Sequence, residues 1–370
     1  MSNPLLILES FGQSVWLDYL SRDLIESGVL QQMIKEDGVS GVTSNPAIFE
    51  KAINGSTVYD KAIAILVKEG RDVAAIYQEL TVRDVANAAD QLYPVYTATE
   101  GTDGFVSLEV SPHFAHDSDA TIQEARELWT LLDRVNVMIK VPATQAGLIA
   151  IRQLITEGIN VNVTLLFGLS RYKEVCDAYL GGLERRLQMG QSIHSVASVA
   201  SFFLSRIDSL VDSLLTQASN HEKALQYQGK IAIGSANLAY QHYQDIFSSQ
   251  RFQLLVDHGA RPQRLLWAST STKNPAYSDT KYVESLIGAN TINTMPMETL
   301  AAYSDHGQPA ARLATQLGEA QSVMEGIHQV GINMDSIAQQ LEEEGLQKFI
   351  DPYDKLFASL KQKTGKTLNE

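Results

Sequence analysis

Short apolar segments alternate with longer segments of helical periodicity along nearly the whole chain of 370 residues. Eight of the apolar segments have the length and character of buried β-strands. They span residues 14–19, 41–45, 104–110, 135–141, 160–167, 195–203, 264–269 and 289–294. Intervening segments such as 172–187, 237–256 and 279–286 are typical of helices. This alternation favours an α/β fold, a (β/α)₈ (TIM) barrel, over an open doubly wound sheet. The glycine-rich phosphate-binding motifs of open sheets do not occur.

Further helical segments at 21–38, at 46–100 and after residue 298 predict extra helices inserted near the N-terminus and at the C-terminus. No linker rich in Pro, Gly or Ser divides the chain, so we expect a single domain over residues 1–370. Thr121 and Glu124 have the spacing of a capping box, which predicts a helix that begins near Thr121.

The inward faces of the predicted strands carry polar residues. Because side chains alternate across a strand, Val137, Ile139 and Val141 share one face of the fourth strand, and Met138 and Lys140 share the other. The same parity places polar groups toward the C-terminal ends of six inward faces: Asp18, Asn45, Glu109, Lys140, Thr164 and Ser201. Barrel active sites lie at this end, and so many buried polar groups need partners or a ligand. The pattern therefore predicts a catalytic site.

Lys140 is the most informative of these residues because it lies within an apolar strand. Burial of an isolated ammonium is costly and favours loss of its proton. The neutral amine is a nucleophile that can form a Schiff base with a carbonyl. Asp18 and Glu109 would favour the charged form instead, and the sequence leaves this balance open.

Composition and charge limit the classes of partner that this protein can bind. With 29 basic and 43 acidic residues, the net charge of −14 argues against nucleic acid and anionic membranes. No segment approaches the ~20 apolar residues of a membrane helix, and no secretory signal begins the chain. The single cysteine, Cys176, excludes an intrachain disulfide and fits a reducing, cytoplasmic compartment.

Two segments resemble the transaldolase family of class I aldolase-type enzymes: GVTSNPAIF (41–49) and VMIKVPATQAGLIAIRQL (137–154). Shorter matches are LEV (108–110), NVTLLF (162–167) and SFFLSRI (201–207), and the chain is similar to the longer-chain subgroup. The resemblance implies a barrel enzyme of the pentose phosphate pathway that needs no metal or organic cofactor. It implies transfer of a dihydroxyacetone unit from sedoheptulose 7-phosphate or fructose 6-phosphate to glyceraldehyde 3-phosphate or erythrose 4-phosphate.

The resemblance also implies roles for the catalytic residues. Lys140 resembles the lysine that forms the Schiff base. Asp18 resembles the acid/base that handles the proton of the sugar C4 hydroxyl. Glu109 and Thr164 resemble the pair that holds the catalytic water.

Substrate-binding roles follow in the same way. Asn45 and Ser201 resemble polar groups that orient the substrate, Phe203 an aromatic residue near the site, and Arg206 a phosphate-binding arginine.

One departure from the family pattern concerns the second phosphate contact. Many members have an arginine just after the seventh strand, in a pattern like GASxR, but this chain reads WASTSTKNP (267–275). Ser269 matches the family serine and Ser271 takes the place of the arginine. Lys273, two residues later, could supply the missing charge.

Three alternatives remain open from the sequence. His113, His116 and Asp117 could bind a metal, although their segment is typical of a surface loop. A barrel that binds sugar phosphates without catalysis is a second alternative. The third is a Schiff-base aldolase that releases free dihydroxyacetone from fructose 6-phosphate. We expect small-molecule sugar phosphates as partners, and the sequence leaves open whether the protein is a monomer or a homodimer.

Overall fold

A closed barrel of parallel strands forms the centre of the computed structural model, which describes residues 3–218 and 221–367. Within these residues the strands pair in sequence order, and β8 pairs with β1. They are β1 (Gln13–Leu17), β2 (Val39–Thr43), β3 (Phe105–Glu109), β4 (Val137–Pro142), β5 (Val161–Leu166), β6 (Ser198–Phe203), β7 (Arg264–Ala268) and β8 (Thr291–Met295). The predicted barrel is confirmed, with strand ends displaced by a few residues, and the open sheet is excluded.

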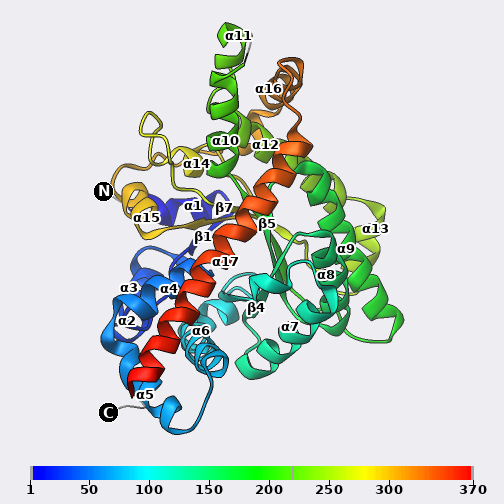
Figure 1. Ribbon diagram of the computed structural model, residues 1–370. Coiled ribbons are helices and arrows are strands. Elements are labelled where there is room, and N and C mark those ends of the chain that lie inside the picture. The colour runs from blue at the N-terminus through cyan, green and yellow to red at the C-terminus, as the bar shows by residue number, and fades with distance from the viewer. Residues whose placement is uncertain (1–2, 219–220, 368–370) are drawn as a thin grey trace.

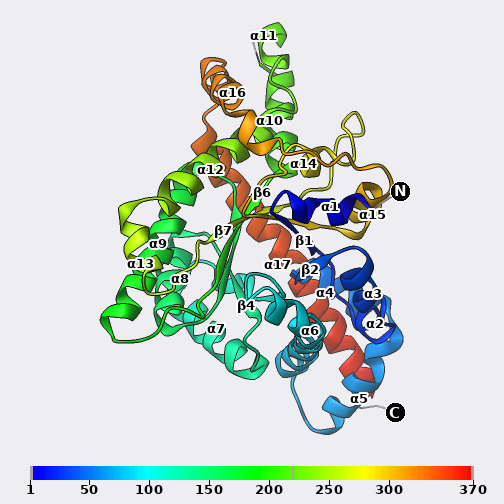
Figure 2. The same ribbon diagram turned by 180° about the vertical axis from the view of Figure 1, so that it is seen from behind.

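Helices surround the barrel in the order that the βα alternation predicts (Figures 1 and 2). Those that follow β3 to β8 are α7 (Ser118–Leu132), α8 (Gln145–Glu157), α9 (Leu169–Gln188), α10 (Ser205–Thr216), α11 (His221–Leu225), α12 (Ile231–Phe247), α13 (Gln250–Val256), α14 (Lys281–Glu284) and α15 (Met297–His306). The helix predicted over 237–256 is two helices. A new helix begins after Ser249, whose hydroxyl caps it by accepting a hydrogen bond from the Phe252 amide.

The predicted extra helices are also present. They are α1 (Pro4–Ser10), α2 (Arg22–Glu26), α3 (Val29–Glu36), α4 (Pro46–Gly55), α5 (Asp60–Lys68), α6 (Val73–Ala98), α16 (Leu317–Gln329) and α17 (Met334–Thr367), with short 3₁₀ turns η1 (Thr57–Tyr59), η2 (Pro112–Phe114) and η3 (Leu313–Thr315). Helix α17 runs across the barrel, from the side of α10 to the side of α4 and α5 (Figure 1). It packs on α4, α6, α10 and β5. No helix among the described residues is both long and apolar enough to cross a membrane.

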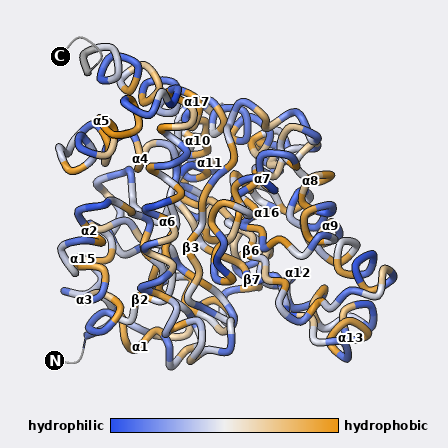
Figure 3. The backbone as a smooth tube through the Cα atoms, turned by 90° about the horizontal axis from the view of Figure 1, so that it is seen from below, coloured by the Kyte–Doolittle hydropathy of each residue, from blue (hydrophilic) through white to orange (hydrophobic). Residues whose placement is uncertain are grey.

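The strands are buried on both faces. On β4, Val137, Ile139 and Val141 are fully buried, and Met138 on the other face is 1% exposed. Around the barrel, hydrophobic and hydrophilic residues alternate along the helices (Figure 3), as expected where one helix face packs on the strands. Inside the barrel, Trp16 lies so close to Gly41 that a Cβ there would come within 2.3 Å of the indole ring. Gly41 is therefore required at this close approach.

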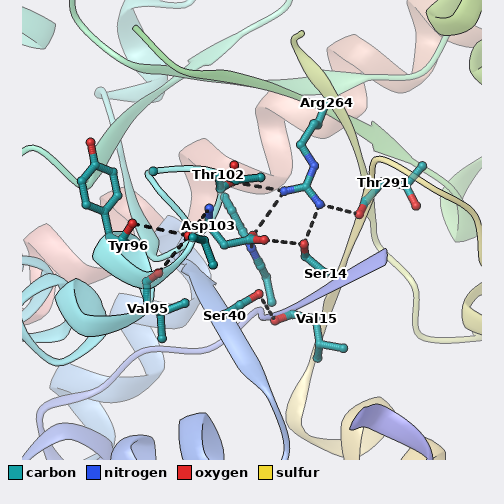
Figure 4. A network of polar contacts seen from close by, with 12 residues as sticks. Ser14, Val15, Ser40, Val95, Tyr96, Thr102, Asp103, Arg264 and Thr291 are labelled. Carbon is teal, nitrogen blue, oxygen red and sulfur yellow. Dashed lines mark hydrogen bonds and ion pairs between the residues drawn. The ribbon is translucent and has the colours of Figure 1, made fainter. Parts of the chain in front are cut away.

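A buried ionic network closes the N-terminal end of the barrel (Figure 4). Arg264, the first residue of β7, pairs with Asp103 at 3.3 Å and donates hydrogen bonds to Ser14 and to the Thr291 carbonyl. Asp103 also accepts hydrogen bonds from the Ser14 hydroxyl at 2.6 Å and from the Trp16 indole at 2.8 Å. These contacts tie the starts of β1, β7 and β8 to the segment before β3.

The predicted capping box was wrong. Helix α7 begins at Ser118, and its N-cap is Asp117, whose carboxylate accepts a hydrogen bond from the Ala120 amide at 3.0 Å. Asp117 is as good an N-cap as threonine and lies four residues earlier, so Thr121 and Glu124 fall inside the helix. Glu124 instead accepts a hydrogen bond from the Ser111 amide at 2.5 Å.

Candidate active site

A cavity of about 220 Å³ lies at the C-terminal ends of the strands. It brings together all the predicted site residues except Glu109: Asp18, Asn45, Lys140, Thr164, Ser201, Phe203, Arg206, Ser269 and Lys273. These residues come from positions spread over more than half of the sequence. The barrel gathers them because parallel strands in a closed sheet end at the same rim.

Lys140 lies deep in this cavity, on β4, and is only 4% exposed. Its Nζ donates a hydrogen bond to the Ser44 carbonyl at 2.9 Å and forms an ion pair with Glu109 Oε1. Glu109 and Lys140 are partners in the register of β3 and β4, so the strand pairing itself places the two side chains together. Glu109 thus lies behind Lys140 and contacts the cavity through it.

Two carboxyl groups near Lys140 have perturbed acidities. Asp18 follows β1 and accepts a hydrogen bond from the Thr43 hydroxyl at 2.8 Å. Burial raises the pKa of Asp18 and of Glu109, and the positive charge of Lys140 opposes this rise in both cases. Because the net change is upward, both groups hold a proton at higher pH than an exposed carboxyl does. Such groups are suited to donate and accept protons during a reaction.

Two buried polar atoms in the cavity have no hydrogen-bond partner within the described residues: Thr164 Oγ1 and Arg206 Nη1. Such atoms are rare in folded proteins unless a ligand or water satisfies them. Thr164 also precedes Leu165, whose φ of 56° lies in the left-handed region, where the pairing of β5 with β6 shifts register. Backbone strain of this kind is typical of functional sites.

Ser201, Asn162 and Asn45 are held by defined hydrogen bonds. Ser201 donates a hydrogen bond to Asn162 Oδ1 at 2.6 Å, and Asn162 donates one to Ser107 at 3.0 Å. Asn45 lies beyond β2 and not on it as predicted. Its Oδ1 caps α4 by accepting a hydrogen bond from the Ile48 amide at 3.0 Å. The proline after it, Pro46, ends the strand pattern and suits the first position of a helix.

The segment after β7 supplies the far end of the cavity. Ser269 has a φ of 55° and shares a hydrogen bond with the Ser205 hydroxyl at 2.8 Å. Lys273 Nζ donates a hydrogen bond to Ser271 Oγ at 2.7 Å, and both residues line the cavity with Arg206. The lysine predicted to replace the absent arginine is therefore at the cavity.

The same loop is fastened to α10 by two contacts. Tyr277 donates a hydrogen bond to Asp212 at 2.5 Å, and Lys281 pairs with Asp208 at 3.1 Å. These contacts hold the C-terminal end of the segment that carries Ser271 and Lys273.

Sequence reasoning missed six residues that line the cavity: Thr43, Ala268, Thr294, Pro296, Glu298 and Phe349. Glu298 lies at the start of α15, just beyond β8, so a search for polar residues after each strand would have found it. Phe349 comes from α17, with its ring centroid 5.9 Å from Lys140 Nζ. No strand or motif marks Phe349, because only the path of α17 brings it to the cavity.

The metal alternative gains no support. No cluster of three or more His, Cys, Asp or Glu residues in the described ranges could hold an ion. His113 Nε2 instead contacts Asp354 of α17 at 2.7 Å.

Fold and site together define a class of protein. It is a (β/α)₈ barrel with a buried lysine, paired with a carboxylate, at the C-terminal ends of its strands.

Comparison with known proteins shows the family to which the chain belongs. The model of the family Transaldolase/Fructose-6-phosphate aldolase matches residues 15–360, and the chain belongs to this family. It is 47% identical over 375 residues to the transaldolase of Trichodesmium erythraeum, a match that covers 99% of each chain. It is 46% identical to transaldolase 2 of Nostoc punctiforme over 98% of each chain. The transaldolase of Mycolicibacterium smegmatis is 46% identical over 96% of each.

Proposed function

We propose that this protein is a transaldolase that transfers a dihydroxyacetone unit between sugar phosphates through a Schiff base on Lys140. The observation that carries the proposal is the placement of the Lys140 amine, buried in the cavity and in contact with Glu109. Donors would be sedoheptulose 7-phosphate or fructose 6-phosphate, and acceptors glyceraldehyde 3-phosphate or erythrose 4-phosphate, as in the non-oxidative pentose phosphate pathway. The whole of residues 1–370 forms the one domain that carries this activity.

The first half of the reaction makes the imine. Glu109 takes a proton from the Lys140 ammonium, and the free amine attacks the C2 ketone of the donor. The carbinolamine then loses its hydroxyl as water, with Glu109 returning the proton to the leaving oxygen, and the C–N bond becomes a protonated imine. The raised pKa of Glu109 suits this exchange, because it lets the group hold the proton between the two steps. Thr164, whose buried hydroxyl lacks a protein partner among the described residues, would hold the water.

The second half breaks and remakes a carbon–carbon bond. Asp18 removes the proton of the C4 hydroxyl, the C3–C4 bond breaks, and its electron pair moves into the imine to give an enamine. The first aldehyde leaves. The enamine carbon, which was C3 of the donor, then attacks the carbonyl carbon of a second aldehyde, and Asp18 returns its proton to the oxygen of that aldehyde. Hydrolysis of the imine by the reverse of the first steps releases the new ketose.

Arg206 would bind the substrate phosphate, because it lines the cavity, its buried Nη1 has no hydrogen-bond partner among the described residues, and a guanidinium suits phosphate oxygens. Ser269, Ser271 and Lys273 line the same cavity and would complete the phosphate site. Asn45, Ser201 and Phe203 would orient the carbon chain.

A second candidate is an aldolase that protonates the enamine and releases free dihydroxyacetone. The family name covers both activities. The names of the full-length relatives, which are transaldolases, favour transfer. The two are separated by supplying fructose 6-phosphate with erythrose 4-phosphate. A transaldolase gives sedoheptulose 7-phosphate from this mixture. An aldolase gives free dihydroxyacetone from fructose 6-phosphate with or without erythrose 4-phosphate.

We place the reaction in the cytoplasm with small sugar phosphates as partners. The chain's net charge of −14 and its lone cysteine support this placement. Cys176 is buried and unpaired, as expected in a reducing compartment.

Trapping of the intermediate tests the proposal. The protein is incubated with fructose 6-phosphate, reduced with borohydride, digested and analysed by mass spectrometry. We expect a reduced dihydroxyacetone adduct on Lys140. In Lys140→Met the adduct is absent and kcat falls by about three orders of magnitude or more, as expected on loss of a covalent nucleophile. An adduct on Lys173 or Lys273, or full turnover by the variant, would contradict the proposal.

A further inference from the structure

A second cavity borders Glu109, and none of its lining residues lines the cavity that holds Lys140. Its volume is about 210 Å³, enough for several water molecules. Polar groups from four elements line it: Glu109 of β3, Ser111 after β3, Tyr77 of α6, Glu124 of α7 and Tyr353 of α17. The main cavity and this second cavity have different linings, and Glu109 lies between them.

Glu109 therefore has two faces. On one side its Oε1 contacts Lys140, which lines the main cavity, and on the other it borders the second cavity. The side chain is only 7% exposed. A substrate that fills the main cavity would cover Lys140, and the second cavity would still border Glu109.

Glu124 is the other carboxyl group of the second cavity. Its Oε2 accepts a hydrogen bond from the Ser111 amide at 2.5 Å. Burial raises the pKa of Glu124 to about 7, while the Ser111 hydrogen bond opposes the rise and Glu127 on the same helix adds to it. The described lining contains no lysine or arginine that would keep Glu124 charged. Glu124 thus exchanges its proton near neutral pH.

Two tyrosines complete the cavity. Burial raises the pKa of Tyr77 well above its ordinary value and that of Tyr353 to about 12, and the nearby carboxyl charges add to both rises. Both hydroxyls therefore stay protonated across the working pH range. They can pass a proton along a chain of hydrogen bonds without becoming charged for long.

We propose that Glu124 stores and returns protons for Glu109 through the second cavity. This inference rests on the proposed function, because it concerns the protons that Glu109 exchanges during imine formation and hydrolysis. Glu109 passes the first proton of the Lys140 ammonium through cavity water to the carboxylate of Glu124. Glu109 is then free to move the second proton from the attacking nitrogen to the carbinolamine oxygen. Glu124 returns its proton to Glu109, which gives it to the hydroxyl that leaves as water. The reverse sequence serves imine hydrolysis, so no proton is gained or lost over a full cycle.

Glu124→Gln tests the relay, because glutamine keeps an acceptor for the Ser111 amide but cannot exchange a proton. The readout is the rate at which the borohydride-trapped adduct on Lys140 appears with fructose 6-phosphate, measured from pH 5.5 to 9 by rapid quench. We expect the rate to fall at least about tenfold, less than the ~10²–10⁴ of a group that transfers the proton directly. We also expect the inflection near neutral pH to disappear. Glu127→Gln, an exposed site one turn along α7, should keep the rate and an inflection, which moves only slightly to lower pH because the charge of Glu127 adds a minor part of the raised pKa of Glu124.

A second variant tests whether Glu124→Gln acts only by disturbing the local structure. Ala75 of α6 lines the second cavity, and Ala75→Leu would displace its water while leaving Glu124 in place. We expect this variant also to slow adduct formation about tenfold. If Glu124→Gln matched Glu127→Gln in rate and pH profile, the relay would be wrong, although the Lys140 adduct would still form. Absence of any adduct in the unaltered protein would instead refute the proposed function itself.

Discussion

Single residues at the mouth of the barrel fall into two groups. Asp18 and Ser201 already have protein partners, Thr43 and Asn162, which hold their side chains in one orientation. Thr164 Oγ1 and Arg206 Nη1 are buried and have no such partner within the described ranges. The first group is preorganised and the second awaits a ligand, which is the arrangement expected of a binding site built for polar substrates.

At the phosphate end, Lys273 provides a direct test. Lys273→Met removes the charge beside Ser271 but keeps most of the aliphatic chain. Loss of one charge-assisted hydrogen bond costs about 1.5–3 kcal/mol, so we expect KM for fructose 6-phosphate to rise at least about tenfold. Steady-state kinetics with fructose, which has no phosphate, supplies the contrast and should change little. Lys68→Met, at an exposed lysine on α5, is the matched control. An equal loss with fructose would show that Lys273 does not bind the phosphate.

Among the elements, α17 contributes most to the site after the strands. It brings Phe349 to the cavity and packs on β5 and α10. Gly345 allows the close approach, because a Cβ there would lie 3.0 Å from Leu165 Cδ2 and 3.4 Å from Arg206 Nη1. The ion pair of Lys355 with Glu50, at 2.8 Å, fastens the far part of the helix to α4.

We therefore expect Gly345→Val to disturb substrate binding from outside the barrel. The branched side chain presses on Leu165 and Arg206, so the helix or the guanidinium must move. Displacements near 1 Å at a binding group can cost up to about a hundredfold, and we expect kcat/KM for fructose 6-phosphate to fall about tenfold or more.

Gly318→Val is the control for that experiment. Gly318 is also helical, in α16, and a Cβ there would meet no atom within 4 Å. Both variants place a branched side chain in a helix. If they reduced kcat/KM equally, the contact of α17 with Arg206 would not be the cause.

In the molecule as a whole, one end of the barrel carries the candidate site and the other end contributes to stability. The C-terminal end carries the candidate site, and the N-terminal end is held by Arg264, Asp103 and Ser14 (Figure 4). This division is general for barrels, where the bottom supports stability and the top supports chemistry.

Asp103→Asn tests this division. It leaves the buried Arg264 guanidinium without its counter-charge, and breaking a buried ion pair costs about 3–5 kcal/mol. We expect denaturant unfolding to show a loss of that order, with kcat per folded molecule unchanged. Asp90→Asn breaks the exposed pair of Asp90 with Arg134 and should cost less than about 1 kcal/mol. Equal losses in the two variants, or a reduced kcat in Asp103→Asn, would contradict this assignment.

Most of the fold was predictable from local pattern. Strand parity placed Lys140 on the inner face, and the register of β3 and β4 then sets Glu109 beside it. Helix ends were less predictable. The capping-box pattern at Thr121 and Glu124 was overridden by the N-cap at Asp117, since any acceptor at a helix start competes for the same amides. Glu124 was thus assigned a local role, and its place in a buried cavity was missed.

The sequence by itself determined the barrel and most of the residues gathered at its C-terminal rim, although Asn45 lies beyond β2 and not on it. These depend on alternation along single strands and on closure of the sheet, which are properties of local pattern. Only the tertiary structure decided that Phe349 and Gly345 of α17 cover the site, that Lys273 reaches Ser271, and that Glu109 separates two cavities. Such contacts depend on how helices far apart in the sequence pack together, and no short-range pattern encodes that packing.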